Sequence, residues 1–194
     1  MKLVLIAIVL IAMLGVAIFL RTGVKKSSDG DISRKADPAI YPEMRELALH
    51  GSRAAFGITG TYSKNQPWGV VMETGYPEGS ATLFALADGN ASIYLSSGGG
   101  RIGGIGREKI RDAAQQVVQI ASQFQPEMKL TSIFPVPRRG ETIFYVLTDG
   151  GVFTASASEE KLGNNRHRFS PLFHAGHGVI TEFRLLDERR EKKL

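Results

Sequence analysis

The hydrophobic pattern of the chain opens with an unbroken apolar segment from Leu3 to Leu20. Its eighteen residues, LVLIAIVLIAMLGVAIFL, carry no charge. As a helix rising about 1.5 Å per residue, the segment would extend about 27 Å, close to the thickness of the hydrocarbon core of a bilayer. The pattern therefore predicts a lipid-spanning helix at residues 3–20, with residues 1–21 as the membrane anchor.

A cleaved signal peptide is the main alternative for this segment. Signal peptides usually have an apolar region of about 7–15 residues that ends in small residues at a cleavage site. Residues 17–21 read AIFLR and contain no such site, so a retained single-pass anchor is the better interpretation. Arg21, Lys25 and Lys26 follow the segment, whereas only Lys2 and the α-amine precede it, and the positive-inside rule then favours a cytoplasmic C-terminal domain.

Beyond the anchor, residues 22–36 are polar and aperiodic, which is typical of a juxtamembrane linker. Residues 42–55 then form the first helix candidate, with an apolar stripe that includes Met44, Leu47 and Ala48. The predicted soluble domain begins just before this helix, at residue 37.

Short apolar runs bounded by turn residues predict an antiparallel sheet. The sequences YPEG and DGN separate three of these runs, which indicates a meander, and DGG separates two later runs, which indicates a hairpin. A further short strand is expected before the hairpin, at Leu130–Phe134. The other strands are expected at Trp68–Thr74, Ala81–Ala87, Ala91–Ser96, Thr142–Leu147 and Val152–Ser156.

Two further helices are expected. Residues 107–125 place apolar side chains at three-and-four spacing and end before Pro126, which predicts a helix packed against the sheet. Ser170-Pro171 is a favourable helix start, and a helix is expected to follow it. Gly176 and Gly178 leave an alternative open, in which residues 178–185 form a strand.

This order of elements predicts an α+β protein in which one N-terminal transmembrane helix precedes a two-layer domain. The domain would consist of an antiparallel sheet, built from a three-strand meander plus a hairpin, with helices packed on one face. The predicted domain covers residues 37–187, and residues 188–194 form a charged tail.

Composition excludes only a few classes of function. The chain has 194 residues, no cysteine and a net charge of +5, so disulfides and cysteine nucleophiles are excluded. Much of the basic excess lies beside the apolar segment and in the last dozen residues. Charge alone therefore gives little reason to expect nucleic acid as a partner.

The glycine-rich run at residues 98–106 is the strongest candidate for a ligand-binding site. It contains G-x-G-x-x-G at Gly98, Gly100 and Gly103, with Arg101 and Arg107 beside it. Backbone N–H groups at a helix start can hold a phosphate or carboxylate. The dinucleotide fingerprint, however, requires a βαβ unit, and the preceding strand belongs to a meander. The principal interpretation is that the glycines permit a tight turn, and an anion site is the alternative.

Other signatures are weak. His174 and His177 are three residues apart and could share a metal on a helix, but no third ligand lies at suitable spacing, so no metal is predicted. No G-x-S-x-G sequence is present either, no cofactor is expected, and catalysis is not the favoured interpretation.

These patterns favour a membrane-anchored interaction or scaffolding module. Its predicted partners are the lipid bilayer, through residues 3–20, and either another protein or a second copy of the chain. The alternative hypothesis is a small-anion or nucleotide-binding protein, or an enzyme, that uses residues 98–106.

Overall fold

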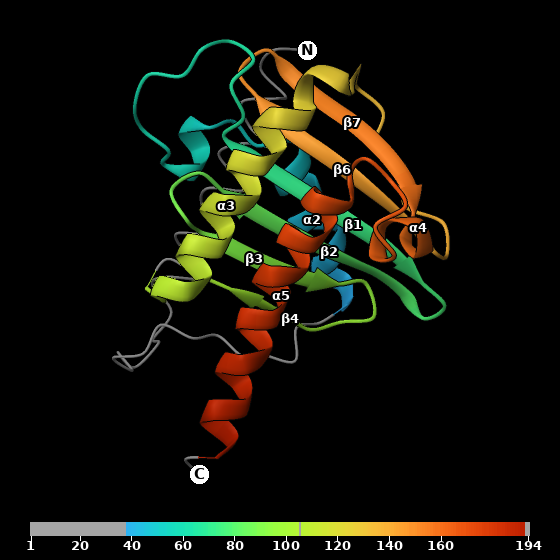
Figure 1. Cartoon of the computed structure of the whole chain (residues 1–194). Coiled ribbons are helices and arrows are strands. Elements are labelled where there is room, and N and C mark those ends of the chain that lie inside the picture. Colours follow the sequence, from blue (N-terminus) through green and yellow to red (C-terminus); the bar gives the residue numbers. More distant parts are fainter. Residues whose placement is uncertain (1–37, 105, 193–194) are drawn as a thin grey trace. The chain divides into compact units, whose positions relative to one another are not determined.

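The computed structural model describes residues 38–104 and 106–192 (Figure 1). The predicted anchor and linker, residues 1–36, lie outside the described residues. Within the described part of the chain, no helix combines the length and the apolar character needed to cross a membrane.

The centre of the domain is a seven-stranded antiparallel sheet in the order β4-β3-β2-β1-β6-β7-β5. The predicted meander is confirmed as β1, β2 and β3, and the predicted hairpin is confirmed as β6 and β7. The strands are β1 (Gly69–Tyr76), β2 (Gly79–Leu86), β3 (Ala91–Leu95), β4 (Gly100–Ile102), β5 (Lys129–Thr131), β6 (Glu141–Thr148) and β7 (Gly151–Ser158).

Alternate residues of the central strands supply two separate hydrophobic clusters. In β1, Val70 and Met72 face one cluster, whereas Val71 faces the other. Successive side chains of a strand point to opposite faces, so a central strand that is buried at all but its last position, as β1 is, must be covered on both faces. In the described part of the chain, helices pack on both faces of the sheet.

Two long helices cover the first face, α3 (Glu108–Phe124) and α5 (Ser170–Glu191) (Figure 1). Both were predicted. The glycines of α5 do not break the helix, so the alternative strand at residues 178–185 is wrong. Buried Gly176 lets α5 lie close to the sheet, because a Cβ there would be 2.7 Å from the Sδ and Cε atoms of Met72.

The second face is covered by α2 (Tyr41–His50), which lies behind the sheet in Figure 1. The sequence predicted helices on one face only, and the structure differs in this respect. Ala48 and Leu49 of α2 are buried against the second cluster, which includes Val71 and Tyr145. The domain therefore has three layers, and α+β remains the correct class.

Candidate functional site

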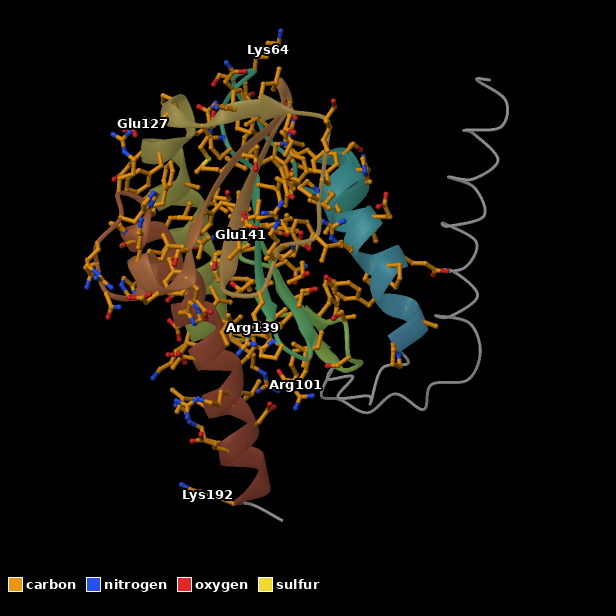
Figure 2. All side chains as sticks on the ribbon, turned by 90° about the vertical axis from the view of Figure 1, so that its right-hand side faces the viewer. Lys64, Arg101, Glu127, Arg139, Glu141 and Lys192 are labelled. Atoms are coloured by element: carbon orange, nitrogen blue, oxygen red, sulfur yellow. The ribbon has the colours of Figure 1, made fainter. Side chains whose placement is uncertain are left out.

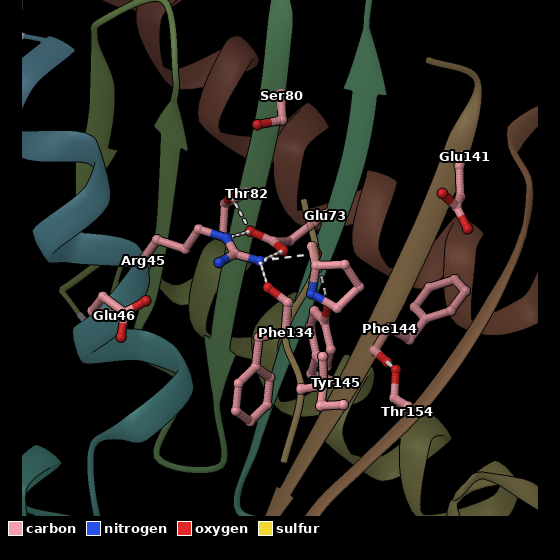
Figure 3. Close-up of polar contacts among 12 residues, drawn as sticks. Arg45, Glu46, Glu73, Ser80, Thr82, Phe134, Glu141, Phe144, Tyr145 and Thr154 are labelled. Atoms are coloured by element: carbon pink, nitrogen blue, oxygen red, sulfur yellow. Dashed lines mark hydrogen bonds and ion pairs between the residues drawn. The ribbon is translucent and has the colours of Figure 1, made fainter. Parts of the chain in front are cut away.

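A buried ion pair joins α2 to the middle of the sheet. Arg45 donates from Nε to Oε1 of Glu73 at 2.8 Å and from Nη2 to Oε2 at 2.7 Å (Figure 3). The Glu73 side chain is completely buried, and that of Arg45 is 9% exposed. Thr82 donates a further hydrogen bond to Glu73, and Tyr41 hydrogen-bonds with Thr82 and Ser80. The carboxylate is thus fully engaged by protein groups.

The same arginine holds the loop between β5 and β6. Its Nη2 donates to the carbonyl oxygens of Phe134, at 3.0 Å, and Pro135, at 3.1 Å (Figure 3). The Tyr145 hydroxyl also donates to the carbonyl of Pro135, at 3.1 Å. Burial, and then the charge of Glu73, raise the pKa of Tyr145, so the phenol keeps its proton for this bond.

These contacts define a rigid surface feature, which we call the strap, residues 130–137. Its three outward side chains are the most exposed large hydrophobic residues of the described chain: Leu130 is 64% exposed, Ile133 74% and Val136 60%. Arg45 and Tyr145 fix the backbone between Ile133 and Val136 at the carbonyls of Phe134 and Pro135, and Leu130 is held by its pairing with Phe153. Apolar side chains held in this way lose little conformational entropy on binding a partner.

The ion pair itself shows the features of a structural element. Burial alone would lower the pKa of Arg45, but the hydrogen bonds and the charge of Glu73 outweigh it and raise the pKa. The Arg45 guanidinium therefore stays charged near neutral pH. With both oxygens of Glu73 engaged by Arg45 and one also by Thr82, the arrangement can fix α2 and the strap, and it offers no open carboxylate for proton transfer.

Residues 96–99 form the turn between β3 and β4, and residues 100–102 of the glycine-rich run form β4 itself. The N–H of Gly98 donates to the carbonyl of Leu95, and that of Gly103 donates to the carbonyl of Ala91. A Cβ on Gly100 would lie 2.4 Å from the carbonyl oxygen of Ile93. These contacts support the turn interpretation of the glycines, because two of the three N–H groups of the motif serve the protein's own backbone.

The two arginines of the predicted anion site differ in position. Arg101 points toward α5 and forms a two-point ion pair with Asp187, with its closest contact at 2.7 Å. Arg107 lies at the N-cap position of α3 and is half-buried. The structure thus brings the glycines and Arg101 together, but an anion would have to displace Asp187 from Arg101. Anion binding stays a prediction.

His174 and His177 lie on α5, as the helix interpretation predicted. His174 is exposed and hydrogen-bonds Asn165 at 2.9 Å, whereas the ring of His177 packs against that of Phe173, with 4.2 Å between the ring centroids and an interplanar angle of 51°. Burial, with a smaller effect of His174, lowers the pKa of His177. Among the described residues, no three His, Cys, Asp or Glu side chains are placed to hold a metal.

A shallow groove of about 330 Å³ lies between α3 and the loop before β1. Its lining carries amides and hydroxyls over an apolar floor and contains no carboxylate or imidazole, so it lacks groups for acid–base chemistry. The lining residues are Tyr62, Gln66, Pro67, Ala87, Gln115, Val118, Gln119 and Ser122.

No protein-family model, curated protein or solved structure matches this chain. The functional argument therefore depends on the chain's own residues. Sequence reasoning missed Arg45, Glu73 and the strap; the one available signal was Glu73, a carboxylate inside the apolar run WGVVMET.

Proposed function

We propose that this protein is a membrane-tethered interaction module whose described domain binds a protein partner through the strap. The observation that carries the proposal is the combination of strongly exposed Ile133 and Val136 with a backbone fixed by a buried ion pair. Large apolar side chains exposed together on a soluble surface are typical of interaction sites. The apolar sequence at residues 3–20 would keep the domain near a bilayer.

The stability of the domain should not depend on these side chains. Ile133 and Val136 contribute mostly exposed area, so Ile133→Asp and Val136→Asp should change the free energy of unfolding by no more than about 0.5 kcal/mol. A partner that buries them, by contrast, would lose affinity, because a carboxylate in an apolar contact must be desolvated.

The proposal is tested by chemical crosslinking of the tagged full chain in its native membranes. The parent chain should give a stoichiometric crosslinked partner, and Ile133→Asp should reduce its recovery at least tenfold. Leu47→Asp is the matched control, because Leu47 is an exposed apolar residue of α2 (42%) outside the strap, and it should retain the partner. Recovery of the chain alone, or equal loss in both variants, would contradict the proposal.

A further inference from the structure

One edge of the sheet is only partly closed. β5 pairs with β7 at Val152, Phe153 and Thr154, and β7 continues to Ser158. No other described residue forms a ladder with residues 155–158 on that side. In Figure 1, β5 flanks only the beginning of β7. Four residues of a regular strand therefore present an unpaired edge.

The direction of the free backbone groups follows from the register. The N–H of Glu159 donates to the carbonyl of Gly140, so odd-numbered residues of β7 direct their N–H and C=O groups toward β6. The N–H and C=O groups of Ser156 and the N–H of Ser158 consequently point outward, whereas Ser158 is the N-cap of α4 (Glu159–Gly163) and gives its C=O to the first turn of that helix. Both serines are exposed.

The side chains of residues 155–158 do not protect this edge from pairing with another strand. Sheet edges are usually shielded by Pro, Lys, a bulge or a very short strand. Residues 155–158 read Ala-Ser-Ala-Ser, with small uncharged side chains and no proline. The opposite edge, β4, has only three residues and the charged side chain of Arg101, and it is shielded in the usual way.

We infer that the β7 edge at residues 155–158 accepts an extended, acidic peptide segment of a protein partner as an added strand. This inference rests on the proposed function, which it deepens by naming the binding mode and the chemistry of the partner. Strand addition supplies affinity through the main chain and specificity through alternate side chains. The free N–H and C=O of Ser156 and the free N–H of Ser158 provide two donors and one acceptor.

The surrounding charge selects acidic side chains on one face of the added strand. Lys129 lies beside Thr154 at this edge, and Arg138 and Arg139 precede Glu141, which is opposite Ser158. Glu141 accepts a hydrogen bond from the backbone of Arg138, and Arg139 lies below Glu141 in Figure 2. Glu159 and Glu160 follow Ser158, and Glu160 is ion-paired with Arg166. Lys129, Arg138 and Arg139 thus outnumber Glu141 and Glu159 near this edge.

Apolar side chains fit the other face. Ala155 and Ala157 are partly buried against the first hydrophobic cluster, and Leu130 lies on the same face because it pairs with Phe153. Small alanines leave room for larger apolar groups of the added strand. The preferred segment therefore alternates acidic and apolar residues.

A second copy of the chain fits this edge poorly. In an antiparallel pair of β7 edges with Ser156 opposite Ser158, residues 152–154 of the copy would lie opposite residues 160–162. The β5 strand of the copy borders its residues 152–154 on this same edge. It would therefore occupy the place of α4 (Glu159–Gly163).

The inference is tested with the full chain in phosphatidylcholine nanodiscs and a fluorescein-labelled peptide, Glu-Val-Glu-Val-Glu-Val, blocked at both ends. Fluorescence anisotropy should show saturable binding below about 1 mM, at least tenfold tighter than for the peptide with Lys in place of Glu. Ser156→Pro removes one outward N–H and no bond to β6, and it should abolish binding. Ser156→Thr keeps that N–H and should bind like the parent.

Equal binding by the two Ser156 variants, equal binding of the Glu and Lys peptides, or no binding at 1 mM would overturn the inference. The crosslinking experiment separates it from the proposed function. Loss of the partner in Ile133→Asp with retention in Ser156→Pro would support the proposed function and contradict the inference about the β7 edge. Peptide binding without any crosslinked partner would support the inference about the edge and contradict the proposed function.

Discussion

At the scale of single residues, the ion pair between Arg45 and Glu73 needs a physical reason. Removing two charges from water costs several kcal/mol per ion, and an apolar pair of similar volume often gives equal or greater stability. Arg45, however, also satisfies two carbonyl oxygens of the loop after β5. The pair therefore fixes three segments at once: α2, β1 and the strap.

Loss of one charge should consequently be costly. Glu73→Gln leaves the Arg45 guanidinium buried without a counter-charge, and we expect the free energy of unfolding to fall by about 3–5 kcal/mol. The double variant Arg45→Met/Glu73→Leu removes both charges and should be more stable than the single variant. Urea unfolding of residues 31–194 measures both values. A Glu73→Gln variant as stable as the parent would show that the pair does not hold the layers together.

The sequence contains part of the information for this site. A glutamate inside the apolar run WGVVMET marks a carboxylate that a central strand must bury, and a buried carboxylate needs a cation. The identity of that cation was not predictable, because Arg45 lies on a different element, 28 positions away. Exposure of Ile133 and Val136 depends on how the loop crosses the sheet, which local patterns do not determine.

At the scale of elements, the strands and the helix with strong apolar periodicity were predicted correctly, whereas a glycine-rich strand was not. The meander, the β6–β7 hairpin and α3 follow from regular apolar spacing and clear turn residues. β4 was missed because Gly100 and its glycine neighbours have low strand propensity, and pairing with β3 overrides that propensity. α4 was missed because its five residues are too few for a periodic signal.

The sequence did not predict that α2 covers the second face of the sheet, for a different reason. The exposed side of α2 includes the apolar residue Leu47, whereas buried Arg45 faces the sheet. A pattern of apolar positions alone therefore gives an unreliable inner face. The two-sided apolar character of β1 was the better indication that both faces of the sheet are covered.

The two glycines of α5 make a matched prediction. A Cβ on Gly178 meets nothing within 4 Å, so Gly178→Ala should raise the free energy of unfolding by about 0.5–1 kcal/mol through helix propensity. Gly176→Ala gains the same propensity but forces buried Met72 to move, and overpacking of this kind costs about 1–3 kcal/mol. Thermal and urea unfolding should therefore rank Gly178→Ala above the parent and above Gly176→Ala. The reverse order would contradict the close packing of α5.

At the scale of the whole molecule, the proposed activity needs no moving part. The three layers fix the strap and the open edge of β7 in one domain, and Leu130 of the strap pairs with Phe153, two residues before the open edge. A partner that covers the strap and adds a strand would use apolar contacts and backbone hydrogen bonds together. Confinement to a bilayer would raise the effective concentration of a partner held in the same membrane.

That advantage depends on the anchor, which gives the last prediction. The apolar segment 3–20 has no charge to be dehydrated on insertion, so the full chain should stay with the membrane pellet after alkaline carbonate extraction. Deletion of residues 3–20 should move the chain to the aqueous fraction while its unfolding transition remains. Because the chain has no cysteine, Lys64→Cys on the exposed surface provides a single site for a membrane-impermeant maleimide. Labelling only after the membrane is opened on its cytoplasmic side would support the predicted orientation. An unclipped full-length chain in the aqueous fraction would contradict the membrane-tethered part of the proposed function. The strap and the β7 edge would then be tested as binding surfaces of a protein without a membrane anchor.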